Sequence, residues 1–174
     1  MVSQTQLLLA KYGNPAASKA AKAEFTAKFM TLYNFPDWLL PYWPKYMKQG
    51  VKRQWVNKDV VAPLEAVFKE LIATGLVKEL KEYNGCWVIR EMRQGGQPSA
   101  HSWGLAFDFN ASLNPQGKKF VEGQGMFSQK FVDVWKKHGF MAGADFPLPD
   151  RQHFQLTLPQ PTPVKASTTK PATK

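Results

Sequence analysis

The chain contains a single cysteine, Cys86, and only three histidines among its 174 residues. One cysteine excludes an internal disulfide framework and a zinc cage built from several thiolates. Long hydrophobic runs are missing too, because no apolar stretch approaches the roughly 18 to 20 residues that span a bilayer. Residues 7–10 form too short a stretch for the core of a signal peptide. These absences predict a soluble protein of a reducing compartment, without a membrane span or a signal peptide.

Acidic residues are scarce relative to basic ones. The chain has 13 Asp and Glu against 23 Lys and Arg, which gives a formal net charge of +10. The basic residues are scattered, and we find no recognition helix or RNA-binding motif, so a specific nucleic-acid partner is not predicted. Nucleic-acid binding would explain the charge and nothing else. The charge favours an anionic polymer or a solvated surface.

Hydrophobic residues make up 44% of the chain and aromatic residues 13%, which is enough for a packed core. Residues 14–33 are rich in Ala and Lys and predict a helix with a partial apolar stripe. Residues 35–44 combine prolines with aromatic residues and predict an ordered covering loop. Apolar residues at helical spacing predict further helices over 60–72, ended by Gly75, and over 128–138.

The second half of the chain also contains strand patterns. Residues 76–82 and 86–90, joined through Tyr-Asn-Gly at 83–85, predict a hairpin with an Asn-Gly turn. Residues 104–110 and 153–158 each alternate between apolar and polar side chains. Helices followed by strands predict an α+β fold with a small antiparallel sheet and flanking helices.

The composition divides the chain into three parts. Residues 1–56 predict a helical and aromatic, proline-rich segment that packs on the main domain, which we place at 57–158. Residues 159–174 consist mainly of Pro, Thr, Lys, Ala and Ser and predict a disordered basic tail, because they offer no apolar face to bury.

Two of the histidines stand beside the alternating strands. His101 precedes the first strand, whose polar face carries Asp108, and His153 opens the second strand on its polar face. If these strands pair, Asp108 and His153 project from the same side of the sheet, and the loop before the strand can bring His101 to them. Two imidazoles and one carboxylate with an open fourth position are typical of a catalytic zinc site. Taken singly, each residue is more simply explained as a surface polar group than as a metal ligand.

Two separated motifs carry a family resemblance. Residues 99–108 read Ser-Ala-His-Ser-Trp-Gly-Leu-Ala-Phe-Asp, or S-x-H-x-x-G-x-A-x-D. Downstream, 143–146 read Gly-Ala-Asp-Phe and 150–153 read Asp-Arg-Gln-His. Over 60–158 the chain resembles the VanY-type zinc D-alanyl-D-alanine carboxypeptidases and the related L-alanyl-D-glutamate endopeptidases of phage endolysins. The resemblance implies the Hedgehog/DD-peptidase fold, one zinc ion and a monomer.

Carried over residue by residue, the resemblance makes His101, Asp108 and His153 the zinc ligands. The acid three residues before the second histidine is the family's catalytic base, which here is Asp150. Such a base can take the proton of a metal-activated water and pass it to the leaving amine.

The resemblance also implies an arginine upstream of the first motif that binds the substrate carbonyl or carboxylate. Arg90 fits best, with Arg93 as the alternative. Ser99 either orients the substrate and the His101 loop or simply caps that loop. Asp145 is expected to support a ligand histidine, with a turn-forming role before Pro147 as the alternative. Many relatives have Trp where Phe146 stands, which should affect packing more than chemistry.

The sequence thus predicts a zinc metallopeptidase that hydrolyses peptidoglycan stem peptides, as an L-Ala-D-Glu endopeptidase or a D-Ala-D-Ala carboxypeptidase. A phage lysin would stay in the host cytoplasm until its release to the anionic cell wall, or travel with the virion. The alternative is a non-catalytic zinc-containing module that binds the wall or builds the phage particle. The presence of Asp150 favours the enzyme, since a dead homologue would tend to lose the base before the ligands.

Overall fold

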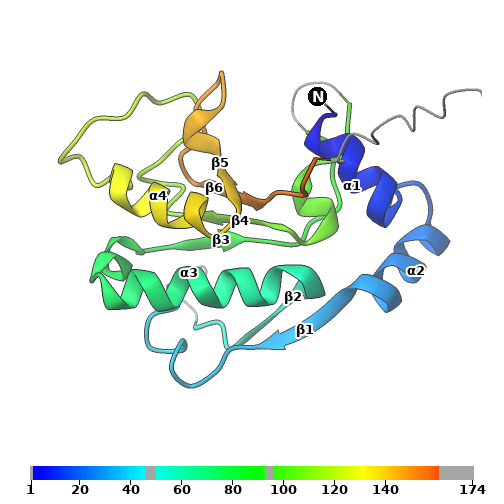
Figure 1. The fold of residues 1–174 in the computed structure, drawn as a ribbon, viewed down its shortest axis with the longest axis horizontal. Coiled ribbons are helices and arrows are strands. Elements are labelled where there is room, and N and C mark those ends of the chain that lie inside the picture. Colours follow the sequence, from blue (N-terminus) through cyan, green and yellow to red (C-terminus); the bar gives the residue numbers. More distant parts are fainter. Residues whose placement is uncertain (1, 46–49, 93–95, 161–174) are drawn as a thin grey trace, which may run out of the picture.

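The computed structural model describes residues 2–45, 50–92 and 96–160. Within these residues the chain forms helices and small antiparallel sheets, so the predicted α+β class is confirmed (Figure 1). The α-helices are α1 (Gln4–Tyr12), α2 (Lys19–Phe29), α3 (Val61–Ala73) and α4 (Gln129–Lys137). The strands are β1 (Met30–Asn34), β2 (Arg53–Asn57), β3 (Tyr83–Gly85), β4 (Ala106–Phe109), β5 (Phe140–Ala142) and β6 (His153–Leu156). Four 3-10 turns complete the described elements: η1 (Lys58–Val60), η2 (Leu76–Glu79), η3 (Ala100–Trp103) and η4 (Gly143–Asp145).

The strands form two antiparallel sheets. One is the two-stranded ribbon β1–β2, and the other has the strand order β3-β4-β6-β5. In the larger sheet β4 and β6 pair so that Asp108 lies opposite His153 and Phe107 lies opposite Phe154. The two strands therefore pair, and as expected for that case the two polar residues lie on one face of the sheet.

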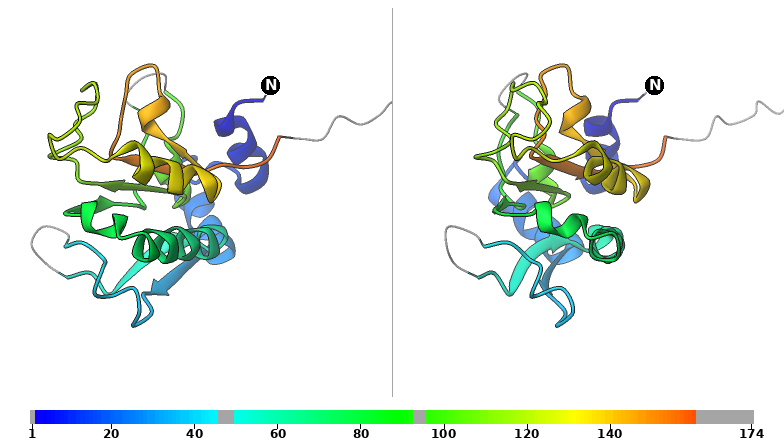
Figure 2. Two further views of the ribbon diagram at one scale, coloured as in Figure 1. Left: turned by 60° about the vertical axis from the view of Figure 1, so that its left-hand side comes forward. Right: turned by 90° about the vertical axis from the view of Figure 1, so that its left-hand side faces the viewer.

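The opposite face of the larger sheet is buried under two helices. Phe107, Phe109 and Phe154 have no exposed surface. Trp135 of α4 contacts all three rings, and Phe68 of α3 packs against both Phe109 and Trp135. Both views of Figure 2 show α3 and α4 side by side. Strand alternation thus separates an apolar face under the helices from a polar face that can carry chemistry.

Two of the predicted helices and the covering loop match the structure. The helix predicted over 60–72 is α3, which is followed by Gly75 at φ +72°, and the helix predicted over 128–138 is α4 with Ser128 as its N-cap. The loop over 35–44 is ordered, because the ring of Trp43 is buried against that of Phe68 at a centroid distance of 5.0 Å.

The N-terminal helix predicted over 14–33 is wrong at both ends. The helix α2 begins after Ser18, whose hydroxyl accepts from the Ala21 amide, and at Met30 the chain continues directly into β1. Residues 30–34 pair with β2, a partner that is distant in sequence and that a helical pattern does not reveal. The helix α1, with its capping box between Ser3 and Gln6, was not predicted.

The predicted hairpin is also wrong. Residues 76–79 form the turn η2, and the Tyr-Asn-Gly segment is itself a strand, β3, rather than a turn. It pairs with β4 across a register shift between Tyr83 and Gly85, where Gly85 has φ +124°. The Asn84 side chain accepts a hydrogen bond from the Ala111 amide at 2.9 Å, so it is used across the sheet rather than in a local turn.

Side chains from residues 1–56 share one core with the rest of the chain, including Leu8, Phe25 and Leu39. The tail expected at 159–174 lies outside the described residues from position 161 onward. None of the helices in the described ranges has the length and apolar character to cross a membrane.

Candidate metal centre

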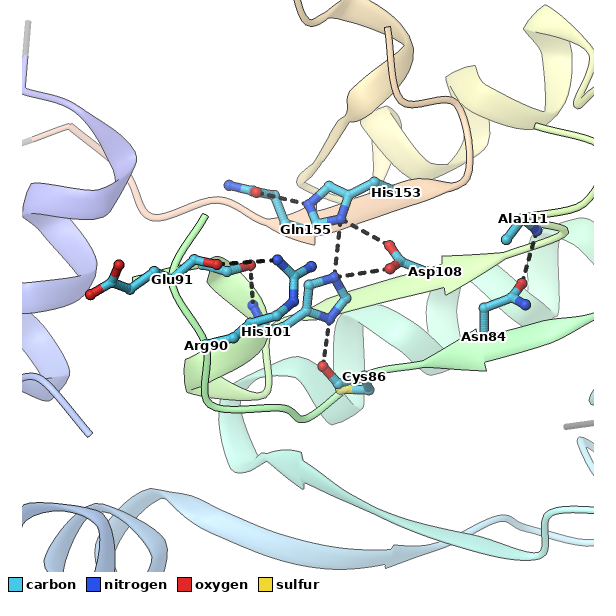
Figure 3. Close-up of polar contacts among 10 residues, drawn as sticks. Asn84, Cys86, Arg90, Glu91, His101, Asp108, Ala111, His153 and Gln155 are labelled. Atoms are coloured by element: carbon cyan, nitrogen blue, oxygen red, sulfur yellow. Dashed lines mark hydrogen bonds and ion pairs between the residues drawn. The ribbon is translucent and has the colours of Figure 1, made fainter. Parts of the chain in front are cut away.

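Three side chains meet on the polar face of the larger sheet (Figure 3). Nε2 of His101 lies 3.2 Å from Oδ2 of Asp108, and Nδ1 of His153 lies 3.0 Å from Oδ1 of the same carboxylate. The two ring nitrogens are 3.3 Å apart. The side chains are 4%, 21% and 9% exposed for His101, Asp108 and His153, so the carboxylate keeps the most contact with solvent.

The spacing of these atoms fits a small tetrahedral ion. Ligands about 2.0 to 2.1 Å from zinc at tetrahedral angles lie about 3.3 Å from one another. One ligand atom from each of the three residues can be chosen so that all lie within 4.8 Å of one another. Nitrogen and carboxylate donors are those that zinc prefers, and three protein ligands leave a fourth position for water or substrate. The cluster could therefore hold a metal ion.

The backbone of Cys86 sets the orientation of the first histidine. Its carbonyl oxygen lies 2.6 Å from Nδ1 of His101. A carbonyl can only accept, so Nδ1 must carry the proton and Nε2 presents a lone pair to the cluster. The thiol of Cys86 is buried, and burial raises its pKa well above the usual range. The role of the Cys86 backbone was not predicted.

Gln155 does the same for the second histidine. Its Oε1 lies 2.9 Å from Nε2 of His153. The amide oxygen accepts, so the proton sits on Nε2 and the lone pair of Nδ1 faces His101 and Asp108. Gln155 stands two residues after His153 on the same strand, and the alternation of β6 therefore puts both on one face. The spacing of two residues from His153 on a strand is the sequence signal that could have identified Gln155.

The charges in the cluster favour an ionised carboxylate. Burial alone would raise the pKa of Asp108, but whenever the two histidines carry a second proton, their hydrogen bonds and positive charge hold the pKa of Asp108 well below its usual range. Burial alone would lower the pKa of His153, yet the hydrogen bond and charge of Asp108, with contributions from Gln155 and Asp150, raise it overall. The Asp108 carboxylate is thus available as an anionic ligand at neutral pH.

Local structure holds His101 in place through the turn η3. Ser99 caps this turn, and its Oγ accepts from the His101 amide at 3.4 Å. Trp103 ties the turn to the N-terminal segment, since its Nε1 donates to the Gly13 carbonyl at 2.8 Å. Gly104 ends the turn at φ +65°, where a Cβ would collide with Met30. The structure thus shows Ser99 as a cap, and Ser99 also lines the cavity beside the cluster.

A cavity of about 350 Å³ opens on one side of the cluster. Asp108 and His153 form part of its wall, together with Asp150, and the backbone of Asp150 accepts from the His153 amide at 2.9 Å. Phe146 also lines the cavity, with its ring 5.8 Å from the ring of His153.

The loop that carries Asp150 is fixed by its neighbour Arg151, whose Nε donates to the Phe127 carbonyl at 2.7 Å. Arg151 was not predicted.

Arg90 lies at the edge of the same cavity. Its backbone is held on both sides by Ser102, whose Oγ accepts from the Arg90 amide at 3.1 Å and donates to its carbonyl at 2.9 Å. The side chain is exposed, and its Nη1 donates to the Glu91 carbonyl at 3.3 Å. Arg93, the alternative, lies outside the described residues.

Two other titratable residues lie apart from the cluster. The exposed carboxylate of Asp145 pairs with Nζ of Lys136 at 2.7 Å. His138 ends α4, as the sequence predicts, and its Nε2 lies 2.7 Å from Oε2 of Glu70. The structure therefore brings together His101, Asp108 and His153 with Asp150, Ser99 and Arg90, and does not bring in Asp145.

Fold and cluster together define a small α+β domain with a candidate metal site at one face of its sheet. Residues 93–156 match the family model described as D-alanyl-D-alanine carboxypeptidase. The matched segment contains the three clustered side chains and Asp150, and it supports a peptidase that acts on peptidoglycan. No curated protein and no solved structure matches the chain.

Proposed function

We propose that the chain is a zinc-dependent peptidase that hydrolyses peptidoglycan stem peptides. The observation that carries the proposal is the cluster of His101, Asp108 and His153 at the wall of a cavity that Asp150 also lines. The match to carboxypeptidases over 93–156 supports the same class of substrate. When bound, zinc would polarise a carbonyl group and lower the pKa of water from 15.7 to about 7.

In this proposal His101 and His153 hold the ion through Nε2 and Nδ1, the nitrogens left unprotonated by the contacts to Cys86 and Gln155. Asp108 supplies the negative charge. All three residues stand on or beside paired strands, so the ligand set is rigid before any ion binds.

Asp150 is the proposed general base. It lines the same cavity as Asp108 and His153, which supports this role. A carboxylate there accepts the proton of the attacking water and returns it to the leaving amine. Arg90 is proposed to bind the substrate carbonyl or a terminal carboxylate, for which a guanidinium offers two parallel donors.

The positive net charge of +10 suits a protein that collects on the anionic wall. The resemblance to phage endolysins supports assigning the chain to a lysin that stays in the host cytoplasm until its release, or that travels with the virion. Either the L-Ala-D-Glu or the D-Ala-D-Ala bond remains the proposed target.

The proposal is tested by mass spectrometry of purified peptidoglycan digested with the protein, with and without a chelator. We expect defined stem-peptide fragments that disappear with the chelator and return when zinc is added. The masses of the fragments identify the bond. Intact peptidoglycan after digestion by the zinc-loaded protein would overturn the proposal in favour of a non-catalytic wall-binding module.

A further inference from the structure

A second cavity, of about 470 Å³, lies against the same cluster. His101, Asp108 and Arg90 contribute to its wall, so it is continuous with the candidate metal centre. The remaining wall comes from Val51, β2, β3 and the segment after β3, and of these the proposed function uses only the backbone carbonyl of Cys86. Its volume lies within the range of about 300 to 1,000 Å³ that holds small-molecule ligands.

Two tryptophans form one side of this cavity. The rings of Trp55 and Trp87 lie 6.1 Å apart at an angle of 52°. Trp87 is fixed, because its Nε1 donates to the Ser102 carbonyl at 3.3 Å. Trp55 is 43% exposed, although burying a ring of this size would be favourable. The structure therefore holds a large aromatic surface ready beside the metal cluster without covering it.

The rest of the wall mixes polar groups with this aromatic surface. Asn84 accepts from the Ala111 amide through Oδ1, which leaves the two N–H donors of its side chain for other partners. The exposed side chain of Arg53 adds a cation at the rim. An aromatic ring with amide and guanidinium donors around it suits a sugar, whose C–H groups pack on the ring while its hydroxyl and acetamide groups accept hydrogen bonds.

We propose that this cavity binds the N-acetylated amino sugar that carries the stem peptide, with a pyranose ring packed on Trp55. The inference rests on the proposed peptidase function, because it is the peptide attached to this sugar that must reach the metal cluster. Since the cavity shares His101 and Asp108 with the cluster, the bond that is cut lies close to the sugar. The site then acts as an endopeptidase near the glycan strand.

The test compares two substrates with the same pentapeptide, one free and one attached to the N-acetylated disaccharide. For the zinc-loaded wild-type protein we expect a higher kcat/KM for the glycan-bearing substrate. The ratio of the two values should fall about tenfold in Trp55→Ala, the loss expected for one ring contact. Trp55→Phe should retain part of the ratio, and Tyr42→Ala should leave it unchanged. Tyr42 is the matched control, since it is 42% exposed and lines neither cavity.

A binding measurement makes the inference independent of activity. Titration with the peptide-free disaccharide should shift the indole N–H signals of Trp55 and Trp87 in an NMR spectrum, and Trp55→Ala should abolish this binding. If the disaccharide binds while no peptide is cut, the proposed function fails and the sugar site stands. A substrate ratio that is the same in wild type and Trp55→Ala, or no disaccharide binding, overturns the sugar site.

Discussion

Oε1 of Gln155 accepts a hydrogen bond from Nε2 of His153 at 2.9 Å and so turns the other ring nitrogen of the histidine toward Asp108. The two side chains stand on one strand and on one face, two residues apart. An acceptor in this position both fixes the ring and makes the ligand nitrogen more basic. The affinity of the site for a metal should therefore depend on a residue that does not bind the ion.

We expect Gln155→Ala to weaken zinc binding about 10- to 100-fold, the usual effect of losing a hydrogen-bond partner of a ligand histidine. Gln155→Glu keeps an acceptor oxygen and should stay close to the wild type. Competition with a chromogenic chelator measures the affinity. Gln124→Ala is the control at an exposed glutamine. Equal affinities in Gln155→Ala and the wild type would show that the contact does not orient the ring.

The double variant with His101→Ala and His153→Ala should bind no zinc and should unfold at a lower temperature than the loaded wild type, because metal binding stabilises the folded state. Elemental analysis and thermal unfolding measure the two effects. His138→Ala is the matched control, since His138 pairs with Glu70 away from the cluster. Full zinc content in the double variant would contradict the assignment of His101 and His153 as metal ligands.

The elements that position the cluster could be predicted because each has a clear local period. The strand over 104–110 alternates strictly, and the apolar residues of α3 recur at helical spacing. From this alternation Asp108 and His153 were expected on one face of the sheet if the two strands pair, and the observed pairing sets them opposite each other. The identity and alternation of side chains along a strand are visible in the sequence, and they determine which residues share a face of the sheet.

The errors have a different origin. Asn84-Gly85 has strong turn propensity, yet β3 gains more from pairing with β4, a partner more than twenty residues away in sequence. The ribbon β1–β2 likewise depends on distant pairing. The Cys86 contact to His101 uses a backbone carbonyl, which every residue has, so no sequence pattern marks it.

Asp59 joins the N-terminal helix to the rest of the fold. Its Oδ2 accepts from Nζ of Lys11 and from the hydroxyl of Tyr12, each at 2.7 Å. The hydrogen bond from Lys11, opposed by burial and aided by Tyr12, lowers the pKa of Asp59. Folding lowers the pKa of this carboxyl group from its unfolded value of about 3.9. The ionised group therefore stabilises the folded protein at pH values above about 3.9, and the stabilisation is lost as the pH falls through the pKa of the folded state.

We therefore expect Asp59→Asn to cost about 1 kcal/mol at pH 7, or roughly 2 to 4 °C in Tm, because the ion pair is half exposed. The difference in Tm from the wild type should stay constant down to about pH 5 and shrink below about pH 4. Thermal unfolding across this range measures it, with the exposed Asp37→Asn as control. A difference that grows in acid would contradict the assigned ion pair.

The backbone of Gly143 packs closely against the backbone of Asp150. Its carbonyl accepts from the Asp150 amide at 2.8 Å. A Cβ at Gly143 would overlap the Asp150 carbonyl oxygen and lie 3.0 Å from the carbonyl carbon. Gly143→Ala should displace the loop by about 1 Å and lower kcat/KM roughly 10²-fold. Gly50→Ala, where a Cβ meets nothing within 4 Å, is the control. Wild-type turnover in Gly143→Ala would mean that the position of Asp150 is not critical.

The strongest test of the mechanism is Asp150→Asn. Asn is nearly isosteric but cannot accept the proton of the attacking water, so zinc and fold should remain while hydrolysis falls about 10²- to 10⁴-fold. Asp150→Glu should retain measurable activity, because a carboxylate is still present. Its extra methylene displaces the oxygen by about 1 Å and should cost a factor near 10². Steady-state rates on a defined stem peptide, with zinc content measured for each variant, give the comparison.

Asp145→Asn is the matched control, five residues earlier on the same segment. Its carboxylate is exposed and pairs with Lys136, and it does not line the cavity beside the cluster. Its loss should cost at most the small stability of a surface ion pair, about 0.2 to 1 kcal/mol, and little activity. If Asp145→Asn is inactive while Asp150→Asn hydrolyses at the wild-type rate with zinc bound, the proton passes through Asp145. The loop between them would then have to rearrange when substrate binds.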